Sequence, residues 1–144
     1  MPVYQLIKIS GLKDSSRRTI IFLEGGGCEA RTAFCGLSNK SDRDIRARFD
    51  HWVDGAINDN YFHGWPNRAD YKECFSFRWR EQKVRCRLYG FLCHPRKSDP
   101  RFQACVLTGY DRKTSEDTDF AILDAAKRLK NDPHVKKLLE SGFN

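Results

Sequence analysis

Five short segments of the chain carry the alternating apolar and polar pattern, or the short apolar run, of a β-strand. Between the third and fourth segments, Glu81 and Gln82 fit a tight turn, which predicts an antiparallel hairpin. A longer, proline-containing connection precedes the fifth segment. The five segments span residues 4–9, 19–23, 74–80, 83–92 and 102–110.

Apolar residues recur at helical spacing in four other segments. Residues 30–37 and 45–53 follow the second predicted strand and indicate a helical hairpin. Ser41 with Asp44 resembles a capping box for the second of these helices, and Gly55 is a natural stop. Two further helices are predicted at residues 122–129 and 135–139, with start signals at Thr114 and Asp117 and at Asp132 and Pro133.

Two stretches interrupt these patterns. Gly25-Gly26-Gly27 lacks the G-K-[ST] ending of a phosphate-binding loop, so we predict a flexible turn there. The irregular segment 56–70 holds four aromatic side chains, which could stack on bases but more often anchor a loop to the core. We favour anchoring for these residues, Tyr61, Phe62, His63 and Trp65.

The composition is that of one folded domain spanning residues 1–144. Hydrophobic residues make up 40% of the chain, which is too apolar for disorder, and no apolar run reaches the 18 or so residues that span a membrane. The N-terminal residues lack the apolar stretch and cleavage site of a signal peptide. We therefore expect a cytoplasmic α+β protein, in which a helical hairpin packs on a small antiparallel-rich sheet that C-terminal helices follow.

The positive charge is confined to one part of the chain. The formal net charge is +7, and residues 78–113 hold ten Lys or Arg and three Asp or Glu, which is the whole excess. Such asymmetry indicates a polyanionic partner, although a solvated strand face would show it too. Alternation places Arg78 and Arg80 on one face of a strand, and Arg85 and Arg87 on one face of its neighbour. If the apolar residues share the core face, these four arginines share the other.

The six cysteines contain no C-x-x-C pair and do not have the spacing of a zinc ribbon or finger. We predict that they are reduced and buried, and we predict no metal site and no cofactor.

Three segments carry a resemblance to a known family. They are V-R-C-R-L-Y-G-F-L at residues 84–92, Q-A-C-V-L-T-G-Y-D-R-K at 103–113, and the helix at 119–128. With the order strand, helix pair, antiparallel strands and terminal helix, they resemble the RelE/HigB toxin superfamily, especially its phage-derived, Gp49-like branch. The strand at residues 19–23 and the segment beyond Asp132 are additions to the minimal pattern. Both Arg85 and Arg87 could match the strand arginine of the family.

The resemblance implies a type II toxin, an endoribonuclease that cleaves mRNA, usually on the ribosome, by attack of a ribose 2′-OH on the adjacent phosphate. Guanidinium and ammonium groups would stabilise the charge that develops on the phosphate. The general base stays open, with Tyr110 and Lys113 as candidates and His63 and His94 conceivable. The expected catalytic residues are Arg85, Arg87, Arg112 and Lys113, and the expected RNA-binding residues are Arg78, Arg80, Lys83 and Tyr110.

The implied partners are mRNA, the ribosome and a cognate antitoxin of the helix-turn-helix type. One alternative is a non-enzymatic module that binds nucleic acid or nucleoprotein on the same scaffold, because a fold does not fix an activity. A second alternative is a structural domain whose cysteines hold a metal.

Overall fold

A computed structural model describes residues 3–13, 15–56, 58–115 and 117–144. These residues form a six-stranded mixed sheet with the strand order β1-β2-β6-β5-β4-β3. Neighbouring strands are antiparallel except β2 and β6, which are parallel. The strands are β1 (Gln5–Lys8), β2 (Arg18–Glu24), β3 (Phe62–Gly64), β4 (Cys74–Glu81), β5 (Val84–Cys93) and β6 (Gln103–Lys113). The α+β class and the five predicted strands are confirmed, and β3 is additional.

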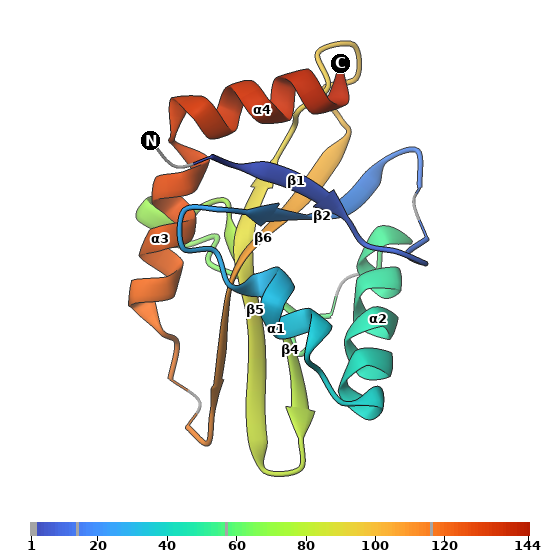
Figure 1. Ribbon diagram of the computed structural model, residues 1–144, viewed down its shortest axis with the longest axis vertical. Coiled ribbons are helices and arrows are strands. Elements are labelled where there is room, and N and C mark those ends of the chain that lie inside the picture. Colours follow the sequence, from blue (N-terminus) through green and yellow to red (C-terminus); the bar gives the residue numbers. More distant parts are fainter. Residues whose placement is uncertain (1–2, 14, 57, 116) are drawn as a thin grey trace.

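Helices cover both faces of this sheet. The helices are α1 (Ala30–Cys35), α2 (Asn39–Val53), α3 (Phe120–Lys130) and α4 (Pro133–Phe143), and a single 3₁₀ turn spans Ala69–Tyr71. The first two pack on one face, against β2, β4 and β6, whereas α3 packs against β5 and β6 on the other side (Figure 1). The last helix, α4, lies against the edge strand β1.

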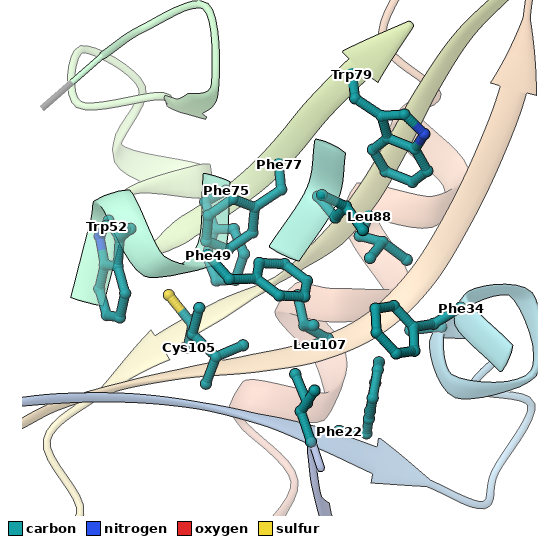
Figure 2. Packing of buried hydrophobic residues seen from close by; sticks show 14 of the residues in the cluster. Phe22, Phe34, Phe49, Trp52, Phe75, Phe77, Trp79, Leu88, Cys105 and Leu107 are labelled. Carbon is teal, nitrogen blue, oxygen red and sulfur yellow. The ribbon is translucent and has the colours of Figure 1, made fainter. Parts of the chain in front are cut away.

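The largest core cluster lies between the sheet and the first two helices. Phe75 and Phe77 alternate along β4 on this face and meet Phe49 of α2, with the rings of Phe49 and Phe77 4.9 Å apart in an edge-to-face contact. Figure 2 shows these rings together with Phe34 from α1 and Trp52 from the end of α2. The apolar residues that alternate along β4 and the start of β5 therefore share one face, as predicted, whereas β2, β5 and β6 also contribute Ile21, Leu23, Phe91 and Val106 to a second cluster with α3 and α4.

Two helix starts differ from the predicted ones. The N-cap of α2 is Ser38, whose hydroxyl accepts a hydrogen bond from the backbone of Ser41, so α2 begins before the predicted cap. Ser41 is buried and donates instead to the carboxylate of Glu81, at 2.9 Å. The N-cap of α3 is Asp119, not the predicted Thr114. Asp132 caps α4 with Pro133 behind it, as predicted.

Residues 58–70 are more regular than their composition indicated, because they contribute the strand β3. Phe62 stacks on Phe75 at 5.0 Å and on Trp52 at 5.9 Å, which confirms that it anchors the segment to the core. A three-residue strand is too short to show a period of two, so the sequence pattern could not reveal it.

Candidate nucleic-acid interface

Four arginines come together on the β4–β5 hairpin. Arg78 is directly opposite Arg87, and Arg80 is directly opposite Arg85. The residues between them, including Trp79 and Cys86, belong to the core on the opposite face. The predicted gathering of these four residues on one face is thereby confirmed, and we call it the arginine face.

The hairpin extends beyond the helices that cover the rest of the sheet, at the lower end of Figure 1. Its turn consists of Gln82, with a φ of 57°, and Lys83, and both residues are exposed. Like charges placed directly across two strands repel one another. An anionic ligand bound over the hairpin would relieve that repulsion.

A cavity of about 610 Å³ lies beside this hairpin, and we call it the basic cavity. Arg78, Arg80, Arg85 and Arg87 line it together with residues of α2 and of the loop before β3. Among its described lining residues, six side chains are basic and one, Asp44, is acidic. Asp44 is already paired with Lys40 at 2.8 Å, and that hydrogen bond holds the pKa of Asp44 below its usual value. The basic cavity therefore has a strong excess of positive charge.

Helix α2 supplies two of these cations. Arg48 donates a hydrogen bond of 2.8 Å to the backbone oxygen of Arg78, and its guanidinium lies 4.2 Å from the ring centre of Tyr61. Lys40 lies two helical turns earlier and is exposed. The sequence does show Lys40, Asp44 and Arg48 at intervals of four residues. It does not show that this face of α2 lies beside β4, so these residues were missed.

Arg87 differs from the other three arginines because it is buried, with 2% of its side chain exposed. Its guanidinium lies 3.5 Å from the carboxylate of Asp111, which also accepts a hydrogen bond of 3.0 Å from the hydroxyl of Tyr89. Burial raises the pKa of Tyr89 to about 12. Lys113 lies 3.5 Å from the same carboxylate. Arg87 is thus a buried member of the arginine face, held by its contact with Asp111. Arg78, Arg80 and Arg85 are its accessible members.

The structure does not bring Tyr110 and Arg112 to the arginine face. Arg112 is the sheet partner of Cys86, and the hydroxyl of Tyr110 donates to the Cys86 sulfur at 4.0 Å. Burial raises the pKa of Tyr110 to about 12, so its phenolate is scarce at neutral pH and it is a poor general base.

A β-bulge explains this placement. Tyr89 pairs with Gly109 and Gly90 pairs with Leu107, which leaves Thr108 as an extra residue in β6. The extra residue reverses the alternation, so Asp111 and Lys113, rather than Tyr110 and Arg112, lie on the arginine face. Simple alternation along β6 could not reveal this bulge or the reversal that it causes.

The cysteines lie in several environments. Cys74, Cys86 and Cys105 are buried as predicted, but Cys35 is exposed, which corrects the expectation that all six are buried. Burial raises the pKa of Cys105 well above its usual value, and that thiol is correspondingly unreactive. Within the described ranges, no three His, Cys, Asp or Glu side chains are grouped as metal ligands.

No helix in the described part of the chain has both the length and the apolar character needed to cross a bilayer. Comparison of the chain with protein-family models, with curated proteins and with solved structures finds no match.

Proposed function

We propose that this protein is a cytoplasmic endoribonuclease of the toxin type, which holds mRNA on the ribosome by its phosphates. The observation that carries the proposal is the arginine face, where two directly opposed arginine pairs border a cavity lined by six basic side chains and one acidic side chain. Arginine suits this task because its planar fork can bind a phosphate through two hydrogen bonds.

The order of the elements supports the same proposal. Along the chain, the strand β1 is followed by the helices α1 and α2, the antiparallel strands β4 to β6 and the helix α3, with β2, β3 and α4 as further elements. This is the order on which the resemblance to the RelE/HigB superfamily rests. A helix-turn-helix antitoxin that restrains the protein belongs to the proposal as its regulatory partner.

In the proposed reaction the 2′-oxygen of a ribose attacks the adjacent phosphate. Arg78, Arg80, Arg85 and Lys113 then stabilise the additional negative charge that develops on the phosphate oxygens. Lys113 is directly opposite Arg85 across β5 and β6. Arg78 and Arg80 lie two residues apart on the same face of β4, with Arg80 directly opposite Arg85, so the four cations can surround one phosphate. Removal of one such donor commonly lowers a rate by about 100-fold to 1,000-fold.

A non-enzymatic binder of nucleic acid is the second candidate function. It is favoured by one observation, namely that Tyr110, a predicted base, lies on the opposite face of the sheet. Both functions use the same arginine face, and they differ in whether bound RNA is cut.

The double variant Arg80→Ala/Arg85→Ala tests the proposal. Each lost charge-assisted contact is worth about 1.5 kcal/mol, so RNA should bind about 100-fold more weakly, and expression should no longer arrest growth. The matched control is Arg17→Ala/Arg101→Ala, which removes the same charge from exposed residues preceding β2 and β6. Binding to a labelled single-stranded RNA and the growth of expressing bacteria are the two measurements.

The control should bind RNA within about twofold of the wild-type protein, because a net-charge effect alone is screened at physiological salt. Equal losses in both double variants would mean that the protein attracts RNA by its total charge, and the site proposal would be abandoned. If the wild-type protein binds RNA strongly but does not cut it, the second candidate function, a non-enzymatic binder of nucleic acid, would be favoured.

Added salt should weaken RNA binding, and the steepness of this effect is proportional to the number of phosphates that the protein contacts. Four contacts to single-stranded RNA predict a slope of about −3 in a plot of log K against log salt concentration. The Arg80→Ala/Arg85→Ala variant should flatten this slope to about −1.5. Titrations at several salt concentrations measure both slopes, and an unchanged slope in the variant would show that these arginines do not contact phosphate.

A further inference from the structure

His63 of β3 lies next to the arginine face. Phe62, its neighbour in the chain, points into the core against Phe75, so alternation places His63 on the opposite side of the sheet, with the arginines. Its direct cross-strand partner is the buried Ser76. Side chains directly opposite on one face have Cβ atoms about 5 Å apart.

Arg78 reaches back along β4 toward the same place. Its Nε donates a hydrogen bond of 3.3 Å to the hydroxyl of Ser76, which brings its guanidinium over the serine that His63 faces. An accessible phosphate-binding arginine and an imidazole are therefore neighbours on one surface. An acid–base group beside a phosphate-binding cation is what attack by a 2′-hydroxyl needs.

Adjacent residues before and on β3 line two different cavities. Asn60 and Tyr61 line the basic cavity, whereas Asp59 and His63 line a second cavity of about 700 Å³. The loop before β3 thus borders both cavities, and His63 follows it on β3. The ring of His63 is held by an edge-to-face contact with Trp65, with the ring centres 4.8 Å apart.

The geometry points to His63 as the general base of the proposed ribonuclease, a role that rests on the proposed function. The imidazole takes the proton of the 2′-hydroxyl while the 2′-oxygen forms a bond to phosphorus. The bond from phosphorus to the 5′-oxygen breaks, and the 5′-oxygen takes a proton from water, whose hydroxide is neutralised by the imidazolium. The products are a 2′,3′-cyclic phosphate and a 5′-hydroxyl.

The charges around His63 fit a base. Burial lowers the pKa of His63 from its ordinary value, and Arg78 on β4 and Arg87 on β5 lower it further. Asp59, in the loop before β3, acts in the opposite direction, and Trp65 contributes no charge. The imidazole is therefore mostly neutral at pH 7 and able to accept a proton. It becomes protonated, and is lost as a base, as the pH falls below that lowered pKa.

The experiment compares His63→Ala and His63→Gln with the wild-type protein on ribosomes programmed with a 5′-labelled mRNA. Both variants should cut about 100-fold to 1,000-fold more slowly, as expected for loss of a general base. Both should bind RNA within about twofold of wild type. The cleavage rate of the wild-type protein should fall as the pH is lowered through the pKa of His63. The variants should not show this fall. Added imidazole should restore part of the rate of His63→Ala.

The matched control is His94→Ala. His94 is exposed and follows β5, at the end of that strand away from the arginines, so its loss should leave the rate and its pH dependence unchanged. His63→Gln keeps a polar side chain of similar size and guards against a packing defect in His63→Ala.

The outcomes separate the two proposals. A wild-type protein that binds RNA but yields no 2′,3′-cyclic phosphate overturns the proposed ribonuclease and the role of His63 with it. A wild-type protein that cuts, with His63 variants that cut equally fast, overturns the role of His63 alone. Variants that cut more slowly, still lose rate at low pH and are not rescued by added imidazole would assign His63 a structural role. That result also overturns the inference.

Discussion

Replacement of Arg87 by methionine is expected to destabilise the protein by about 3–5 kcal/mol, the usual cost when one partner of a buried ion pair is removed. Asp111 has 9% of its side chain exposed and would lose the guanidinium that lies 3.5 Å from its carboxylate. Tyr89 and Lys113 would remain beside it, so the loss should fall short of the cost of an isolated buried charge. Urea unfolding followed by circular dichroism measures the change.

Arg85→Met is the matched control for this prediction. Arg85 lies two residues earlier on the same strand and is more exposed, and its guanidinium donates to the backbone oxygen of Thr114 at 2.8 Å. Its replacement should cost less than about 1 kcal/mol, as is usual for surface substitutions. Adding Asp111→Asn to Arg87→Met should recover part of the lost stability, because it removes a carboxylate that has lost one of its two cationic neighbours. Equal stability of the two single variants would contradict the supporting role of Arg87.

Because Arg87 is buried, its replacement cannot be used to test function. A variant without Arg87 would lose activity through instability even if Arg87 never contacts RNA. Arg80 is exposed and Arg85 is partly so, which makes their replacement a test of binding rather than of folding.

The arginine face could be predicted from the sequence because it depends on local pattern. Phe75, Phe77 and Trp79 fix which side of β4 is buried, and a tight turn forces β5 back beside it. The register that sets Arg78 opposite Arg87 follows from the length of that turn.

What could not be predicted depends on contacts between distant parts of the chain. The parallel pairing of β2 with β6 joins residues more than 80 positions apart, as Arg18 and Gln103 show. The burial of Arg87 requires Asp111 from the next strand, and the position of Asp111 requires the bulge at Thr108. His63 was among the conceivable bases, but its position beside Arg78 became visible through the short strand β3.

Replacement of Gly90 by alanine is the second change with a large expected effect. Gly90 lies on β5 at the bulge, and a Cβ there would overlap the carbonyl oxygen of Val106 on β6 and approach the ring of Phe75 to 3.0 Å. Both neighbours are fully buried in the centre of the sheet, and a backbone carbonyl cannot rotate away as the end of a side chain can. Overpacking of this kind costs about 3 kcal/mol or more, which a lowered thermal midpoint would report.

Gly64→Ala on β3 is the matched control, because its Cβ would meet its nearest neighbour, the carbonyl oxygen of Cys74, at an ordinary 3.9 Å. It should change the stability by less than about 1 kcal/mol. The difference matters for the site, since the bulge beside Gly90 is what turns Asp111 toward Arg87. If Gly90→Ala folds at all, the strands must separate there, and RNA binding should weaken along with stability. A Gly90→Ala protein as stable as Gly64→Ala would show that β5 and β6 do not approach so closely, and the account of how Asp111 and Lys113 reach the arginine face would have to be revised.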